Sequence, residues 1–185
     1  LYTVVQMGVN KGRIPGSALA LQDTSALLTH FNLMDSDKEV LNAACVLFAK
    51  NPDKYHNQCK VRLGRFEGTT MSEFRDHTVC YGNLFEQYDA IINFCQKHMF
   101  LAARMDEVER VETLTVPFKV VREATLNTII HRDWDAYNLT PSIAIFDDRV
   151  EFQNPGDFPF GSTYKDFIDN PHSSPINPKI ADVFF

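Results

Sequence analysis

Three polar side chains that could do chemistry recur every four residues near the middle of the chain: Glu123, Asn127 and His131. The apolar residues around them predict a helix, and positions i, i+4 and i+8 of a helix fall on one strip of its surface. A carboxylate, an amide and an imidazole in such a strip could hold a magnesium-bound phosphate and activate a water molecule. A solvated polar face has the same spacing, so spacing alone leaves both interpretations open.

The other residues of this segment are expected to position the strip. Pro117 suits the first turn of a helix, where its missing N–H is not needed. The apolar residues expected to pack against the domain are Val120, Val121, Ala124, Leu126, Ile129 and Ile130. Two alternating runs, 142–146 and 150–152, then predict a hairpin. Asn154-Pro155-Gly156 should end its ladder, because proline donates no N–H to a sheet.

Periodicity along the rest of the chain predicts an α+β fold. Helices are predicted over 24–33, 39–50, 83–99 and 117–131, with short ones at 163–168 and 178–185. Strands are predicted at 60–66 and 107–116, whereas 1–25 looks like a strand end plus loop and 68–81 like a polar connection with one short strand or turn. We expect a two-layer sandwich, in which helices cover one face of a mixed, mostly antiparallel sheet.

The strand at 60–66 carries three basic residues, Lys60, Arg62 and Arg65. They could contact phosphates, but the alternation with Val61 and Leu63 favours a solvated face opposite a buried one. Gly64 interrupts the alternation, which predicts a bulge or a close backbone approach there.

Composition limits the classes of function. The formal net charge is −6 and the pI is about 5.5, which argues against a broad surface for nucleic acid. No run of 18 apolar residues and no charged-then-apolar leader occurs, so we expect a cytoplasmic protein without a membrane contact. Four cysteines without a C-x-x-C spacing predict free thiols. Because the chain begins with Leu1 and ends in apolar residues, we expect a fragment of a longer protein.

Several local motifs occur in an order that resembles one family. They are Asn42-Ala43-Ala44, Leu47-Phe48-Ala49-Lys50-Asn51-Pro52, Arg65-Phe66-Glu67-Gly68, Gly82-Asn83-Leu84-Phe85-Glu86-Gln87, Arg122-Glu123-Ala124 with Asn127 and His131-Arg132-Asp133, and Phe146-Asp147-Asp148-Arg149-Val150-Glu151. From about Leu41 to Phe185 the chain resembles the C-terminal domain of RecG-related transcriptional regulators. The resemblance implies that 1–36 is the end of an N-terminal Schlafen/AlbA-type domain and that 37–185 is the RecG-related domain. It also implies a C-terminal winged helix that is not part of this sequence.

That domain is in turn similar to the GHKL ATPases, the group that includes gyrase and the histidine kinases. The resemblance assigns Glu123 as the residue that activates water and Asn127 as the magnesium ligand, with ATP and Mg²⁺ as cofactors. Asn154 and Gly156 then fall in the nucleotide-binding loop, where the group has aspartate-x-glycine-x-glycine. Asn154 replaces the aspartate that reads the adenine amino group, and Phe158 replaces the second glycine. An amide oxygen accepts a hydrogen bond less strongly than a carboxylate.

Three functions follow from these observations. The first is a regulatory, ATP-binding module of a bacterial DNA-binding transcriptional regulator, which contacts DNA through flanking domains. The alternative is a degenerate GHKL-like scaffold or dimerisation domain that binds no nucleotide and could form a homodimer. The third, an active ATPase or helicase accessory, is less favoured, because the chain has no G-x-x-x-x-G-K loop.

Overall fold

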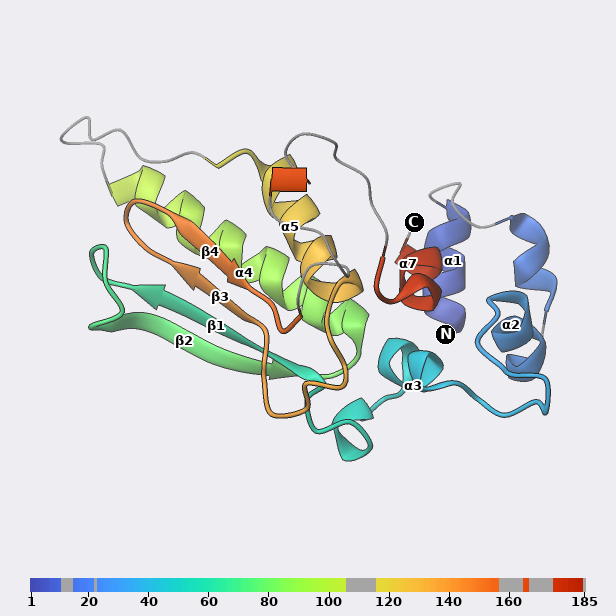
Figure 1. Ribbon diagram of the computed structural model, residues 1–185. Coiled ribbons are helices and arrows are strands. Elements are labelled where there is room, and N and C mark those ends of the chain that lie inside the picture. Colours follow the sequence, from blue (N-terminus) through green and yellow to red (C-terminus); the bar gives the residue numbers. More distant parts are fainter. Residues whose placement is uncertain (11–14, 22, 106–115, 157–164, 167–174, 185) are drawn as a thin grey trace.

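The computed structural model describes residues 1–10, 15–21, 23–105, 116–156, 165–166 and 175–184. Four strands form one sheet in the order β2-β1-β3-β4 (Figure 1). They are β1 (Lys60–Phe66), β2 (Phe74–Tyr81), β3 (Ser142–Ile145) and β4 (Val150–Gln153). The outer pairs are antiparallel and the central pair β1–β3 is parallel. The predicted α+β fold with a mixed, mostly antiparallel sheet is confirmed.

Two helices, α4 (Leu84–Met105) and α5 (Phe118–Ile130), lie along one face of this sheet (Figure 1). The core between the two layers comes from inward-facing positions of the strands and from both helices. Its buried members are Val61, Leu63, Ile91, Phe94, Cys95, Val121, Ile143 and Ile145. Alternation along β1 and β3 puts their other side chains on the opposite face, which no described helix covers.

α4 begins with a reciprocal cap. The side-chain oxygen of Asn83 accepts hydrogen bonds from the N–H groups of Phe85 and Glu86, and the Glu86 carboxylate accepts from the Asn83 N–H at 2.8 Å. Such a cap satisfies backbone donors that the first turn leaves free. Gly82 precedes it at a φ of +116°, a conformation that favours glycine. The predicted start of this helix is confirmed, and the helix extends beyond the predicted end at 99.

A second core joins α3 (Asn42–Phe48), the end of α5 and α7 (Pro178–Phe184). Its buried side chains include Leu33, Leu47, Leu84, Ile130 and Ile180. α7 packs against α5, as Figure 1 shows. Segments that are far apart in sequence therefore meet at the C-terminal end of α5.

The N-terminal segment forms a separate small core from Val5, Ala18 and Leu27. It contains α1 (Tyr2–Asn10), the 3-10 helix η1 (Gly16–Ala20) and α2 (Thr24–His30). The prediction of a strand end and loop was wrong, because α1 buries Val5 against this core. Asp23 caps α2, since its carboxylate accepts from two N–H groups of the first turn.

Two predictions for the sheet edge need correction. β2 is a full strand of eight residues rather than a polar connection. The register shift lies between Arg65 and Phe66, not at Gly64. Arg65 is buried and forms an ion pair with Asp147, so it does not belong to the solvated face.

The strand predicted for 107–116 and most of the helix predicted for 163–168 lie outside the described residues. Between α3 and β1, the chain forms a short 3-10 helix, η2 (Pro52–Lys54). Over the described residues, every helix is too short or too polar to cross a membrane.

Candidate functional site

α5 carries the predicted strip. The helix starts directly after Pro117, whose φ of −57° and ψ of 133° belong to extended backbone. The side chains it buries are Val121, Thr125, Thr128, Ile129 and Ile130. Thr125 and Thr128 satisfy their buried hydroxyls by donating to the carbonyls of Val121 and Ala124, four residues earlier. Val120, which was expected to pack, is instead 54% exposed.

Burial of that face leaves Glu123 and Asn127 on the exposed side of α5. Within the part of the chain that the structure describes, neither side chain has a hydrogen-bond partner. One turn of helix separates them, which corresponds to about 6 Å along the axis. Among the described residues, no side chain occupies their carboxylate and amide oxygens.

His131 has different surroundings from the other two members of the strip. It ends α5, and its N–H donates to the Asn127 carbonyl at 3.0 Å. Burial lowers the pKa of His131 below its ordinary value, because the charged ring would lose hydration. A neutral, half-buried imidazole at a helix end suits a structural role.

The Asn154–Gly156 segment lies directly against the end of α5. The Asp133 N–H donates to the Pro155 carbonyl at 2.8 Å. A Cβ added at Gly156 would stand 3.1 Å from the His131 carbonyl oxygen, and Gly156 has a φ of +143°. Only glycine combines that approach with that backbone conformation without strain.

We call the contact between the Asn154–Gly156 segment and the end of α5 the junction. Asn154 contributes to it a polar side-chain atom that lacks a hydrogen bond within the described part of the chain. Its Oδ1 is buried and has no hydrogen-bond partner among the residues that the structure describes. Buried acceptors are rarely left unpaired, because no hydrogen bond then offsets the free-energy cost of removing the acceptor from water. The structure thus brings Asn154 and Gly156 together with His131, and Asn127 follows one turn back along α5. Glu123 lies two turns from His131, about 12 Å along the helix axis.

Two residues that the sequence did not single out as site residues hold this junction. Arg132 is 2% exposed and donates to the Gln58 carbonyl, and its guanidinium lies 4.3 Å from the centre of the Trp134 ring. Burial lowers the pKa of Arg132 to about 10, so it remains charged at neutral pH. The Asn177 amide donates to the carbonyls of Ile130 at 3.0 Å and Arg132 at 2.7 Å. These bonds fix the last turn of α5.

A second unpredicted cluster lies where β2 meets α4. His98 is 8% exposed, and its Nε2 lies 2.9 Å from the Asp76 carboxylate. Lys97 donates to the same carboxylate oxygen at 2.8 Å. The hydrogen bond from Lys97 lowers the pKa of Asp76, whereas burial lowers the pKa of His98. The cluster joins the edge strand to the helix layer.

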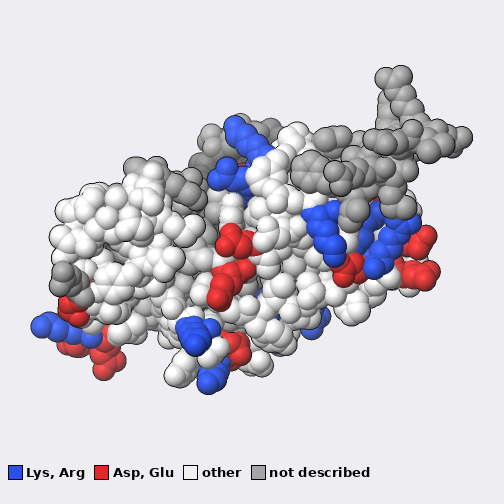
Figure 2. Space-filling model, turned by 180° about the vertical axis from the view of Figure 1, so that it is seen from behind, with Lys and Arg blue, Asp and Glu red and all other residues white. Residues whose placement is uncertain are grey.

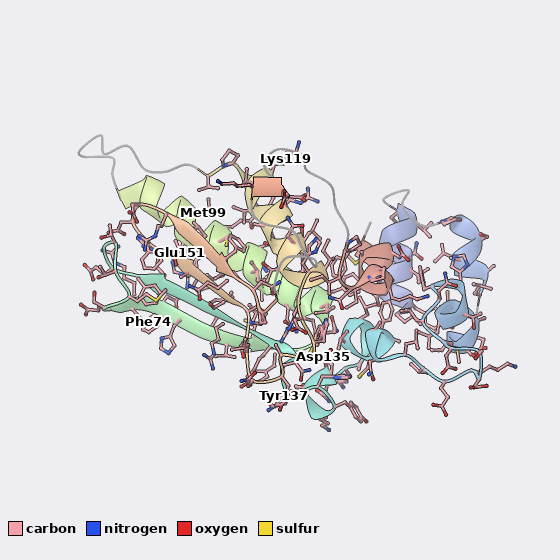
Figure 3. All side chains as sticks on the ribbon, viewed as in Figure 1. Phe74, Met99, Lys119, Asp135, Tyr137 and Glu151 are labelled. Carbon is pink, nitrogen blue, oxygen red and sulfur yellow. The ribbon has the colours of Figure 1, made fainter. Side chains whose placement is uncertain are left out.

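No group of three or more His, Cys, Asp or Glu side chains with metal-binding geometry occurs among the described residues. All four cysteines are free, as predicted. The aromatic residues after α5 differ: Trp134 is half-buried against the second core, whereas Tyr137 is 76% exposed (Figure 3). Asp157 and Phe158 of the predicted nucleotide loop lie outside the described residues.

Charge is distributed unevenly over the molecule. Figure 2 shows Lys and Arg side chains in small groups, separated by uncharged and acidic ones, with no continuous basic surface on that side. The two N-terminal helices α1 and α2 contain no Lys, Arg, Asp or Glu.

Comparisons with known proteins concern the C-terminal part of the chain and its fold. Residues 139–185 match the family model described as "Putative ATP-dependent DNA helicase recG C-terminal". The match supports a RecG-related, ATPase-like domain. It contains Asn154 and Gly156, but it begins after α5 and so includes neither Glu123 nor Asn127. No curated protein matches the chain.

A solved structure has a similar fold. The DIP2311 protein from Corynebacterium diphtheriae superposes with a TM-score of 0.66 at 18% identity, over 99% of this chain and 35% of that one. At this identity the similarity concerns the fold alone. The chain spans about a third of the length of that protein.

Proposed function

We propose that this chain is a regulatory, ATP-binding module of a DNA-binding transcriptional regulator, with the nucleotide at the edge formed by α5 and the Asn154–Gly156 segment. The observation that carries the proposal is the buried, unpaired Oδ1 of Asn154 beside the end of α5. An adenine amino group is a donor that would satisfy this acceptor. The ATPase-like family match over the same segment supports this choice.

The remaining residues fit a nucleotide with its magnesium ion. Magnesium usually keeps several waters and takes one or two protein oxygens together with phosphate oxygens, so the single exposed amide of Asn127 suffices as a protein ligand. The bound ion would neutralise phosphate charge and orient the phosphates. Gly156 lets the backbone lie close to the helix end. The Glu123 carboxylate is the group that would accept a proton from water at this edge.

The proposal extends to the flanking parts of the protein. Residues 1–36 would be the end of an N-terminal Schlafen/AlbA-type domain, and 37–185 the RecG-related domain. Val5, Ala18 and Leu27 form their own small core, but Leu28 and Leu33 belong to the second core, so the packing does not itself mark a boundary at residue 36. Contacts with duplex DNA would come from the flanking domains, because the chain is acidic.

One observation favours the scaffold alternative. Glu123 and Asn127 are both exposed and lack hydrogen bonds within the described structure, whereas side chains of a reaction centre are usually held by neighbours. A domain of this kind could serve dimerisation without a nucleotide. Titration of Mg-ATP separates the two functions, since the scaffold predicts no heat of binding at millimolar nucleotide.

The test is calorimetric titration of Mg-ATP into the protein and three variants. Asn127→Ala should weaken binding roughly tenfold or more, because it removes a charge-assisted contact. Asn154→Leu should also weaken binding, whereas Asn154→Asp should tighten it several-fold by restoring a charged acceptor. Asn138→Ala, in the exposed loop after α5, is the matched control and should leave the affinity unchanged. Equal affinities for all variants would contradict the assignment.

Hydrolysis is tested separately at Glu123. Glu123→Gln keeps the size of the side chain but removes the base, so ATP binding should persist while any phosphate release by the parent chain is lost. Phosphate release at the parental rate would exclude Glu123 as the residue that activates water.

A further inference from the structure

The face of the sheet opposite α4 and α5 carries an aromatic row that the nucleotide proposal does not use. Phe146 directly after β3, Phe66 at the end of β1 and Phe74 at the start of β2 follow one another, with ring centres 5.1 Å and 4.4 Å apart; Phe66 and Phe146 are buried. His77 continues the row 5.1 Å from Phe74. Phe74 is 54% exposed and comes from the strand layer, away from Lys119 on α5 (Figure 3). We call this surface the open face.

A hollow of about 220 Å³ lies on the open face beside this row. Its floor includes two residues with little or no side chain, Gly64 and Ala144, which are neighbours in the β1–β3 pairing. Phe66, Phe74 and Met71 form much of its apolar wall. A cavity of about 150 Å³ holds a benzene molecule, so the hollow has room for one flat ring.

Two cations border the same surface without a countercharge. Arg62 is exposed and lines the hollow, and Lys60 lies 5.8 Å from the centre of the exposed Tyr81 ring. Over the described residues, neither cation forms an ion pair. The carboxylate of Glu151 on this face is already paired with Arg149 at 2.6 Å. The middle and the β2 side of the open face therefore carry unbalanced positive charge.

This combination restricts what can cover the face. An apolar protein surface would bury Arg62 and Lys60 without partners, which is costly. A double helix would keep its bases stacked internally and away from the rings of the open face. A single strand instead offers a flat base and a negative phosphate in every nucleotide, and aromatic side chains stack bases without sequence preference.

We propose that the open face binds a short single-stranded stretch of nucleic acid, with bases stacked on Phe74 and Tyr81 and phosphates on Arg62 and Lys60. The net charge of −6 limits binding to this small surface. We therefore expect weak binding, with a Kd on the order of 10–100 µM at low salt. Two phosphate contacts predict that the logarithm of the association constant falls with the logarithm of salt concentration with a slope of about −1.4. The surface is separate from the α5 edge and would bind whether or not ATP does.

The experiment uses fluorescence anisotropy of a labelled eight-nucleotide oligothymidylate. Phe74→Ala and Arg62→Ala should each weaken binding at least about fivefold, and Arg62→Ala should halve the salt slope. Tyr137→Ala removes a more exposed aromatic ring, from the loop after α5, and Lys119→Ala removes a cation from the helix layer (Figure 3). Both controls should bind like the parent, and a duplex of the same length should bind at least about tenfold more weakly.

Three results would overturn the proposal. The first is no anisotropy change at millimolar protein, with circular dichroism showing a folded chain. The second is an equal loss of affinity in the control variants. The third is a monomer–dimer equilibrium in sedimentation that Phe74→Ala abolishes while oligonucleotide binding stays unchanged, since the open face would then pair two copies of the chain.

Discussion

Replacement of Gly156 by alanine tests the contact between the Asn154–Gly156 segment and the end of α5. At a φ of +143° an L side chain is strained, and its Cβ would stand 3.1 Å from the His131 carbonyl oxygen. Strained backbone conformations cost roughly 1–3 kcal/mol each. The crowded atom is backbone within a hydrogen-bonded helix end, so it has little freedom to move away. We expect the full cost, about 1–3 kcal/mol, to appear in the free energy of unfolding.

Two other glycines separate the causes of this destabilisation. Gly68 has a φ of +71° but nothing within 4 Å of an added Cβ, so Gly68→Ala measures backbone strain alone. Gly16 has open space and an ordinary φ, so Gly16→Ala should be neutral or stabilising by about 0.4–1 kcal/mol. The excess of Gly156→Ala over Gly68→Ala then reports the contact with His131 together with the greater backbone strain at a φ of +143° than at +71°.

Urea denaturation followed by circular dichroism measures these differences, with a thermal melt as a second reading. For a chain of this size each kcal/mol corresponds to roughly 2–4 °C in Tm, so Gly156→Ala should lower Tm by roughly 2–12 °C. The same variant should weaken Mg-ATP binding, because Asn154 would shift away from α5. If Gly156→Ala is no less stable than Gly16→Ala, the segment does not lie against the helix end as described.

The other predictions concern buried polar groups. Arg132→Met should destabilise the chain by about 2–5 kcal/mol, measured by urea denaturation, because it leaves buried carbonyls unpaired; a loss below 1 kcal/mol would show that Arg132 does not hold the helix end. The pKa values of His98 and Asp76 are both lowered in the folded chain, so stability should be highest above pH 6.5. It should fall first as the pH drops below 6.5 and again below 3.8; His98→Gln should make the first decrease smaller but not abolish it, because the pKa of His131 is also lowered by burial, and a first decrease as large as that of the parent chain would refute the role of His98. Burial raises the pKa of Cys59 to about 11 and of Cys95 to about 12, so both thiols should react with a disulfide reagent at pH 8 only on unfolding; rapid labelling of the folded chain would contradict their burial.

Local sequence patterns were sufficient for the elements whose buried faces are apolar. α5 and the β3–β4 hairpin follow from periodicity and from Asp147-Asp148-Arg149 between the strands. β2 could not be predicted this way, because a charged side chain faces the helix layer and apolar side chains are exposed, which is the opposite of the usual pattern. Asp76 faces α4, where Lys97 and His98 pair with it, whereas Val79 and Tyr81 are exposed on the open face. The helix α1 was missed because Val5 becomes buried only through a tertiary contact with α2.

The candidate site shows the same division between local and long-range information. Sequence spacing alone placed Glu123 and Asn127 on one strip of a helix. It could not show that Asn154 reaches the end of that helix, because the contact depends on Asp133, on Gly156 and on the capping amide of Asn177. The buried acceptor of Asn154 likewise has no signature in the sequence. This acceptor can be assigned a role in binding only because the structure shows its segment in contact with the end of α5.

Hydrogen exchange with and without millimolar Mg-ATP tests the central claim most directly, because it locates the nucleotide as well as detecting it. We predict slower exchange along α5 around Asn127 and in the segment around Asn154, with no change on β2 of the open face. Asn138→Ala should show the same protection, whereas Asn127→Ala should reduce it. Saturating ATP that protects neither α5 nor the Asn154–Gly156 segment would contradict nucleotide binding at this edge and would favour the scaffold.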